Sequence, residues 1–285
     1  MQIATITVDG LAVRVGRTSV ASPAISLLLF NGIGASLELV KPLTEAMRRE
    51  GFPSIVFDVP GVGGSETPAL PYRLSRLARL ADKLLGELGL DGPVDVLGVS
   101  WGGALAQEFV HQYPARCRRL VLAATSAGAV MVPGRISALS KMISPRRYTD
   151  PNFMEQMGAE LYGGQYRNDA ALLHEHARHM APPTGKGYVW QLLATVGWTS
   201  ILWLHRIRQP TLVMMGNDDP IVPVVNGRLL TGLIPNSRLY TIDDGHLFLL
   251  SRCAEVVPVI RDFLRESDAD LEGARTCAGR SGQPA

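Results

Sequence analysis

Residues 94–113 read VDVLGVSWGGALAQEFVHQY, and this stretch decides the fold of the chain. Its first six residues form a mostly apolar run that predicts a buried strand, and the residues from Ala104 onward have a helical pattern. Ser100 lies in a sharp turn between them, where Gly98 and Gly102 let strand and helix approach without a Cβ clash. Such a turn places the serine oxygen at the carboxyl end of a strand and at a helix N-terminus, where developing negative charge is stabilised.

The same alternation of short apolar runs and amphipathic segments extends along most of the chain. It predicts strands at 25–30, 54–59, 94–99, 119–125, 210–216 and 237–243, preceded by an antiparallel hairpin of 4–9 and 11–16 that turns at Gly10. It predicts helices near 38–50, 74–89, 102–113, 224–233 and 253–266. Several strands are apolar on both faces, which is typical of strands covered by helices on each side. We therefore predict an α/β fold with a mostly parallel sheet and helices on both faces.

One segment, residues 128–206, breaks this alternation. It lacks a strong strand pattern and is rich in methionine, aromatic residues and glycine. We predict that it is a helical cap inserted into a single core domain, which is made of residues 1–127 and 207–266. The tail, 267–285, is small and polar, and we expect it to be disordered.

Composition excludes several classes of protein. The 285 residues include 28 Lys and Arg against 26 Asp and Glu, and this near balance argues against an electrostatic nucleic-acid binder. The cysteines, Cys117, Cys253 and Cys277, are too far apart in sequence to suggest a disulfide framework or a thiolate metal site. The chain has no signal-peptide pattern at its start and no apolar run of the ~20 residues needed to span a bilayer. We expect a cytoplasmic protein without a transmembrane segment, a nucleic-acid partner or a metal.

A serine hydroxyl is a poor nucleophile unless a base accepts its proton and a third group orients that base. Asp219 follows the predicted strand at 210–216, and His246 follows the one at 237–243. Because parallel strands end at one edge of the sheet, we predict that Ser100 is the nucleophile, His246 the base and Asp219 the orienting acid. Asp218 is the alternative acid. Asp219 is favoured because it stands three residues after Gly216, and Asp218 is then a turn former.

An oxyanion is stabilised by main-chain N–H groups that already point at it. We predict that Trp101, directly after the nucleophile, supplies one of them and that Ile33, in the turn after the strand at 25–30, supplies the other. The glycine-rich loop 58–65 lacks the Lys-Ser/Thr end of a P-loop and the spacing of a dinucleotide site, so we expect it to shape a turn under the rim of the active site.

Three further histidines lie close together in the insertion. His174, His176 and His179 form the sequence HEHARH, which superficially resembles a metal cluster. No carboxylate or cysteine partner stands out near them, so we expect a solvated helical face. His246, by contrast, has a strand before it and a glycine beside it at the expected sheet edge.

Longer segments extend these motifs and resemble one family. They are LLLFNGIGASLELV (27–40), FDVPGVGGSETP (57–68), GVSWGGALAQEF (98–109), LVLAATSAGAVMVPG (120–134), SPRRY (144–148), WQLLATVGWTSILWLHRIRQPTLV (190–213) and IDDGHLFLLSR (242–252). From about residue 4 to 266 the chain resembles the α/β-hydrolase superfamily. Within it, the chain resembles the intracellular poly(3-hydroxyalkanoate) depolymerases that act on medium-chain-length polyesters. The resemblance places the nucleophile, acid and base on Ser100, Asp219 and His246, and Asn31 replaces the histidine of the family's His-Gly turn.

The resemblance implies a serine esterase that needs no cofactor. It would hydrolyse a storage polyester through an acyl-enzyme to 3-hydroxy fatty acids or oligomers, in the cytoplasm at the surface of polyester granules. We expect substrate contacts from Asn31, Met131, Trp190 and Trp198. Two alternatives stay open: a carboxylesterase or lipase for smaller hydrophobic esters, and a non-catalytic granule-associated protein that keeps only the fold.

Overall fold

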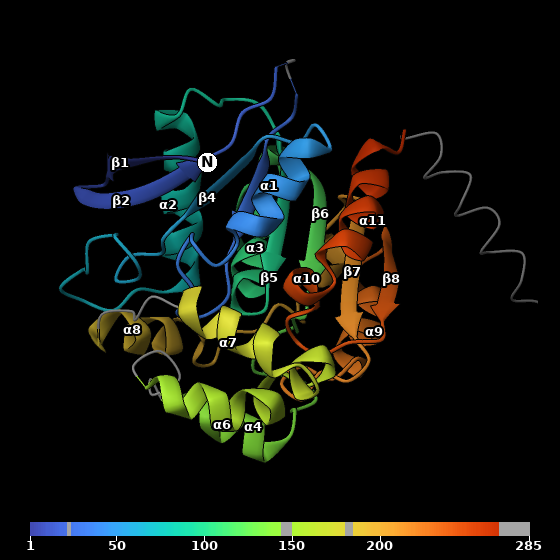
Figure 1. Cartoon of the computed structure of the whole chain (residues 1–285). Helices are drawn as coiled ribbons and strands as arrows, with labels where there is room; N and C mark the ends of the chain where they lie inside the picture. Colours follow the sequence, from blue (N-terminus) through green and yellow to red (C-terminus); the bar gives the residue numbers. More distant parts are fainter. Residues whose placement is uncertain (22–23, 144–149, 180–184, 268–285) are drawn as a thin grey trace, which may run out of the picture.

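The computed structural model describes residues 1–21, 24–143, 150–179 and 185–267. Within these residues, eight strands form one sheet in the order β1-β2-β4-β3-β5-β6-β7-β8 (Figure 1). The strands are β1 (Gln2–Val8), β2 (Leu11–Arg17), β3 (Leu27–Phe30), β4 (Ser54–Phe57), β5 (Val94–Val99), β6 (Cys117–Ala123), β7 (Thr211–Gly216) and β8 (Ser237–Ile242). The strands from β4 to β8 in this order pair in parallel, and β2 pairs antiparallel with both β1 and β4. The predicted mostly parallel α/β sheet is confirmed.

The hairpin of β1 and β2 has the tight turn that its sequence predicts. Val8 pairs with Leu11, and the two residues between them, Asp9 and Gly10, have φ angles of 49° and 78°. An Asp-Gly pair with positive φ at both positions is the favoured two-residue connection of a twisted hairpin. This hairpin forms one edge of the sheet.

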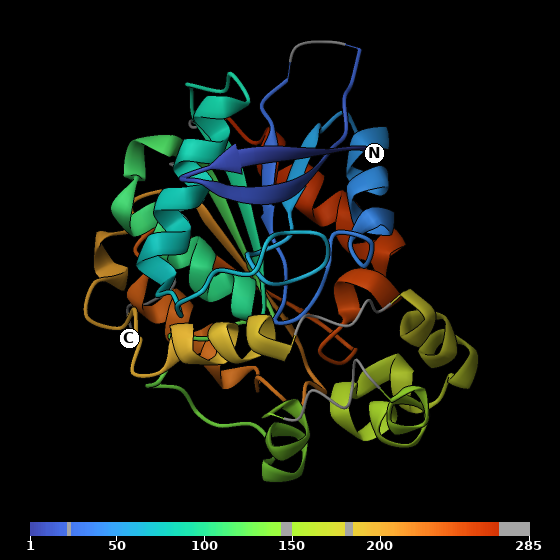
Figure 2. The same ribbon diagram turned by 90° about the vertical axis from the view of Figure 1, so that its left-hand side faces the viewer.

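Helices cover the sheet on both sides, as the doubly apolar strands predict (Figures 1 and 2). In β3, Leu27 and Leu29 pack into one hydrophobic cluster while Leu28 and Phe30 pack into the other. The first cluster includes residues of α1 (Lys41–Arg49), α10 (Phe248–Ser251) and α11 (Cys253–Arg265), and the second those of α2 (Leu74–Glu87), α3 (Trp101–Gln112) and α9 (Val225–Leu233). Helix α10 was not predicted, because four residues are too few to show a helical period.

Between β6 and β7 the described residues form further helices beyond the carboxyl ends of the strands (Figure 1). These are α4 (Ile136–Ile143), α6 (Pro151–Tyr162), α7 (Ala170–His179) and α8 (Gly185–Thr195). The two ends of the insertion meet in an isolated β-bridge between Gly128 and Thr199. Of the tail that we expect to be disordered, residues 268–285 lie outside the described residues.

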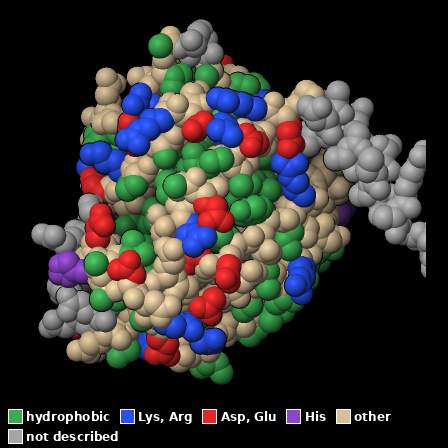
Figure 3. Space-filling model, turned by 45° about the vertical axis from the view of Figure 1, so that its right-hand side comes forward, with side chains coloured by type: hydrophobic (Ala, Val, Ile, Leu, Met, Phe, Trp, Pro, Cys, Tyr) green, Lys and Arg blue, Asp and Glu red, His purple; other side chains and the backbone are tan. Residues whose placement is uncertain are grey.

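Charge is mixed over the surface drawn in Figure 3. Acidic and basic side chains are mingled there with apolar ones, in keeping with the net charge of +2. None of the described helices is both long enough and apolar enough to cross a membrane.

Candidate active site

Ser100 stands at the turn from β5 into α3, in a backbone conformation that side chains rarely adopt. Its φ of 54° and ψ of −119° are strained for a non-glycine residue. The flanking glycines make the turn possible, since a Cβ on Gly98 would lie 2.6 Å from the Cβ of Ala106, and one on Gly102 would lie 2.1 Å from the carbonyl oxygen of Phe30. The close approach of strand and helix that the sequence predicts is therefore present.

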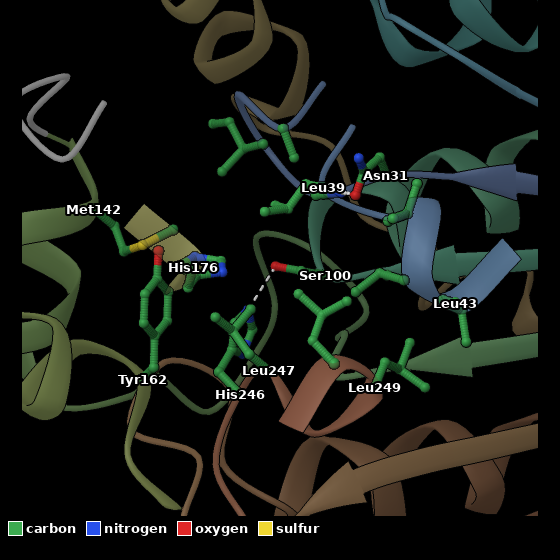
Figure 4. A pocket seen from close by; sticks show the side chains of 16 residues that line it. Asn31, Leu39, Leu43, Ser100, Met142, Tyr162, His176, His246, Leu247 and Leu249 are labelled. Atoms are coloured by element: carbon green, nitrogen blue, oxygen red, sulfur yellow. Dashed lines mark hydrogen bonds between the residues drawn. The ribbon is translucent and has the colours of Figure 1, made fainter. Parts of the chain in front are cut away.

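The structure brings Ser100, His246 and Asp219 into one hydrogen-bonded chain. His246 Nε2 lies 3.0 Å from Ser100 Oγ (Figure 4). His246 Nδ1 lies 2.7 Å from Asp219 Oδ2. Both His246 and Asp219 are buried. A carboxylate beside Nδ1 holds the proton on that nitrogen, which leaves Nε2 able to accept the serine proton. This arrangement can generate an oxygen nucleophile.

The neighbouring acid, Asp218, has other partners than His246. Asp219 faces His246 and its Oδ1 accepts the N–H groups of the two residues after Pro220, at 2.8 and 2.9 Å. Asp218 points to the insertion, where its carboxylate pairs with Arg167 at 2.9 Å and accepts the N–H of Gly164 at 2.9 Å. The structure therefore places Asp219 beside the histidine and makes Asp218 a link between core and insertion.

Main-chain contacts from the insertion also hold the histidine loop. The N–H of His246 donates to the carbonyl oxygen of Tyr162 at 2.8 Å. Asp244 accepts the N–H of Gln165 at 2.7 Å. In each bond one partner belongs to the insertion and the other to the loop that carries His246. The position of His246 therefore depends on the insertion as well as on the core.

The two residues predicted to form an oxyanion hole lie beside Ser100. Trp101 is the first residue of α3, so its N–H belongs to the first turn, whose amides have no acceptor within the helix. Ile33 lines the same pocket as Ser100. The turn that carries Ile33 packs against the nucleophile, because a Cβ on Gly32 would lie 3.9 Å from the Cβ of Ser100. The structure therefore places both predicted residues next to Ser100, and their role as oxyanion donors stays a prediction.

Asn31 and Asp58 hold the turn after β3 in shape. Asn31 donates from Nδ2 to the carbonyl oxygen of Ser36 at 2.8 Å, and its Oδ1 accepts the N–H of Gly32 at 2.9 Å. Asp58 Oδ1 accepts the N–H of Leu37 at 2.7 Å. The side chain of Asn31 therefore closes the turn on itself, and Asp58 fixes its far end.

Asp58 also organises the glycine-rich loop 58–65. Its Oδ2 accepts the N–H of Gly64 at 2.9 Å and pairs with Arg14 at 3.2 Å. Burial raises the pKa of Asp58, against the opposing effect of these N–H groups and of the guanidinium. The sequence predicted only a turn for this loop and gave Asp58 no role, although a lone acid directly after a buried strand is a usable signal.

Gln191, on α8 of the insertion, was also missed. Its side-chain Oε1 accepts the N–H of Gly34 at 2.7 Å, and its carbonyl oxygen accepts the indole N–H of Trp101 at 2.9 Å. Buried residues recur every three positions along α8, at Tyr188, Gln191 and Ala194. This spacing could have placed Gln191 on the inner face of the helix.

A largely apolar pocket adjoins Ser100 and His246 (Figure 4). Asn31 lines it, as do Met142 and Tyr162 from the insertion. Aliphatic side chains form most of the remaining wall: Leu39, Val40, Leu43, Leu247, Leu249 and Leu250. The pocket suits an alkyl group next to the reacting oxygen.

His176 lines this pocket too, and the predicted solvated face is wrong for it. The residue is only 6% exposed, and its ring packs edge-on against Tyr162 and Tyr166. It follows the buried Leu173 by one helical turn, so α7 turns it inward, while His174 is exposed and the side chain of His179 lies outside the described residues. Among the residues that the structure describes, no group of three or more His, Cys, Asp or Glu could hold a metal ion.

A second pocket also includes Ser100. Met131 and Trp198 line it, together with Trp101. Trp190, the remaining residue expected to contact substrate, lines neither pocket. Its indole N–H donates to the carbonyl oxygen of Pro68 at 3.1 Å, and its ring packs at the edge of the core. The structure thus brings Asn31, Met131 and Trp198 to the two pockets and leaves Trp190 outside them.

Comparison with known proteins agrees with this architecture. The family model of the alpha/beta hydrolase fold matches residues 25–252. A hydrolase from Pseudomonas aeruginosa PA01 has the same fold, with a TM-score of 0.79 and 24% identity over 93% of this chain and 98% of that one. The enol-lactonase from Burkholderia xenovorans LB400 superimposes with a TM-score of 0.80 and 21% identity over 92% of this chain and all of that one, 100%.

A nearer relative is the poly(3-hydroxyalkanoate) depolymerase of Ectopseudomonas oleovorans. The two chains are 51% identical over 262 residues, which cover 92% of each. Because the match includes the insertion as well as the core, it is more specific than a shared fold. The chain therefore belongs to the α/β-hydrolase family and, within it, to the family of this poly(3-hydroxyalkanoate) depolymerase.

Proposed function

We propose that the protein is a serine esterase that hydrolyses poly(3-hydroxyalkanoate), with Ser100, His246 and Asp219 as its catalytic residues. The observation that carries this proposal is the hydrogen-bonded chain of these three side chains in a protein 51% identical to a poly(3-hydroxyalkanoate) depolymerase. In this proposal residues 128–206 act as a cap over a core of residues 1–127 and 207–266.

Each residue has a defined step. Ser100 Oγ attacks the ester carbonyl carbon while His246 Nε2 takes the hydroxyl proton, and Asp219 stabilises the imidazolium. The N–H groups of Ile33 and Trp101 stabilise the tetrahedral oxyanion. When the carbon–oxygen bond of the ester breaks, His246 gives its proton to the departing hydroxyl. Water, deprotonated by the same histidine, then cleaves the acyl-enzyme to a 3-hydroxyacyl acid and restores Ser100.

The wall of the pocket beside Ser100 supports a substrate with alkyl side chains of medium length. Its leucines and Val40 offer an apolar surface, and burial of each methylene group contributes about 0.8 kcal/mol. Methionine, here Met142, adapts its shape to flexible chains. A medium-chain polyester gains more from such a surface than a polyester of methyl-substituted units does.

Incubation of the enzyme with amorphous medium-chain poly(3-hydroxyalkanoate) is expected to release 3-hydroxy fatty acids or their short oligomers, measured by mass spectrometry. Hydrolysis of p-nitrophenyl butanoate in the same preparation serves as the control for an active esterase. Cleavage of the small ester without release of acids from the polymer would favour the carboxylesterase alternative. Absence of both activities would favour the non-catalytic granule protein.

We also propose that the protein works in the cytoplasm on polyester granules and that it meets the polymer through an apolar rim around the second pocket. The rim consists of Val130, Val132, Leu193 and Val196, all exposed. In sequence these residues alternate with or adjoin pocket residues such as Met131. A solid polyester surface seated on the rim would lie next to residues that line a pocket reaching Ser100.

Serine at Val130 and Val196, which are 52% and 61% exposed, is expected to weaken adsorption to polyester particles by roughly tenfold, because less apolar area is buried. Adsorption is measured by sedimentation of the particles, and activity on p-nitrophenyl butanoate should stay unchanged. The matched control replaces Ile3 and Ile25, 50% and 39% exposed and away from the pocket, with serine. Equal loss of adsorption in both double variants would contradict a role of the rim.

A further inference from the structure

Gln191 joins the insertion to both segments that carry the proposed oxyanion amides. Its Oε1 accepts the N–H of Gly34, 157 residues away in sequence, at 2.7 Å. Its carbonyl oxygen accepts the indole N–H of Trp101 at 2.9 Å. One residue of α8 therefore contacts the turn that carries Ile33 and the residue that follows the nucleophile.

Because Gln191 is buried, loss of these hydrogen bonds would cost free energy. The residue is 1% exposed, and a buried amide or a buried main-chain N–H without a partner costs about 1–3 kcal/mol. Gly34 is itself buried, with a φ of 71°, so its N–H depends on a partner within the protein. The contact with Gln191 thus fixes the orientation of the peptide group next to Ile33.

The other contacts of this turn come from the core. Asn31 binds Ser36 and also accepts the N–H of Gly32 at 2.9 Å, and Asp58 binds Leu37, so these anchors hold the two ends of the turn. The Gly34 part is held by α8. The turn is therefore complete only when the insertion is seated on the core.

We propose that Gln191 is a positioning residue, through which the seating of α8 aligns the oxyanion amides of Ile33 and Trp101. The proposal rests on the proposed serine esterase function and adds a control of that same site. A donor that moves by about 1 Å from its productive position can cost about 100-fold in rate. The amides act on the transition state, so misalignment should lower kcat and leave ground-state binding nearly unchanged.

Helix α8 also carries part of the apolar rim on its outer side. Leu193 and Val196 are exposed at its end, while Gln191 faces inward. Polymer bound at the rim and the oxyanion turn are therefore in contact with the same helix. Binding of a polyester surface at the rim would hold α8 in the position that the oxyanion hole requires.

The test replaces Gln191 with methionine, which keeps the chain length and removes the strong acceptor. With p-nitrophenyl butanoate, kcat is expected to fall by about 10- to 100-fold while KM changes by less than about twofold. The inhibition constant of an alkylboronic acid, which forms a tetrahedral adduct with the serine, should rise in proportion to the fall in kcat. A general loss of packing would not raise that constant selectively over KM.

Gln107→Met is the matched control, because Gln107 is also fully buried and also hydrogen-bonded. Its side chain donates to the carbonyl oxygens of Gly103 and Ser126 at 3.0 Å and accepts from Ser200 at 2.6 Å. This variant should lower the melting temperature without the split between kcat and KM. An unchanged kcat in Gln191→Met, or a loss confined to KM, would overturn the proposal.

Trp101→Phe tests the same link if Gln191→Met does not fold, since it removes the indole donor to Gln191 together with part of the ring. It should show the same split to a smaller degree, and a wild-type boronate constant in this variant would contradict the proposal. Ser100→Ala separates this inference from the function beneath it. Retained esterase activity in Ser100→Ala would refute the catalytic assignment itself, whereas loss there with normal kinetics in Gln191→Met would refute only the role of Gln191.

Discussion

Ser100→Ala is expected to lower kcat on ester substrates by about 10⁶-fold, because no other group can form the acyl-enzyme. The oxygen of Ser100 lies 3.0 Å from His246 Nε2, and alanine removes the atom that attacks the ester carbonyl carbon. Initial rates with p-nitrophenyl butanoate and with polyester give the measurement. The melting temperature should change little, since alanine keeps the Cβ and the strained backbone of the turn.

Ser75→Ala is the control for this variant, because Ser75 is exposed on α2, away from the pockets. It should keep the wild-type rate. Labelling by a fluorophosphonate should occur in the wild type and in Ser75→Ala and be absent in Ser100→Ala. Full esterase activity or undiminished labelling in Ser100→Ala would disprove the assignment of the nucleophile.

Asp219→Asn is expected to lower kcat by about 10⁴-fold while the fold stays intact. The carboxylate accepts a hydrogen bond from His246 Nδ1–H at 2.7 Å, and an amide there can instead donate to that nitrogen. The histidine would then carry its proton on Nε2 and could no longer accept one from Ser100. The rate on p-nitrophenyl butanoate, with circular dichroism to verify folding, measures the effect.

Asp218→Asn is the matched variant, because it makes the same chemical change at the adjacent residue. Asp218 pairs with Arg167 on a partly exposed part of the surface, where an ion pair contributes about 0–1 kcal/mol. Its kcat should stay close to the wild-type value. If Asp218→Asn were the inactive variant and Asp219→Asn the active one, the assignment of the acid would be reversed.

The sequence was sufficient to predict which segments form the strands of the sheet. Strands such as β3 and β7 are short apolar runs buried on both faces, and this pattern can be read from neighbouring residues alone. The placement of Ser100, Asp219 and His246 after three parallel strands follows from the same local pattern, because all parallel strands end at one edge. Their chemical roles stay predictions until the variants are measured.

Inside the insertion the sequence was less informative. His176 was expected on a solvated face, yet it lies in the pocket beside Ser100, because α7 is packed against the core along the side that includes Leu173. The spacing of the histidines is compatible with a helix, but it does not show which face of that helix packs against the rest of the protein. Trp190, expected to touch substrate, donates its indole N–H to the carbonyl oxygen of Pro68, a contact that also depends on how α8 packs.

The sequence by itself determined the course of the strands and of the longer core helices, the sharp turn at Ser100 and the position of serine, acid and histidine just after a strand. These features depend on residues within a few positions of one another. The tertiary structure alone decided which carboxylate meets His246, that His176 is buried and that Gln191 holds the turn at Gly34. Such contacts join residues up to 157 positions apart, so they depend on how whole faces pack together, which no local pattern encodes.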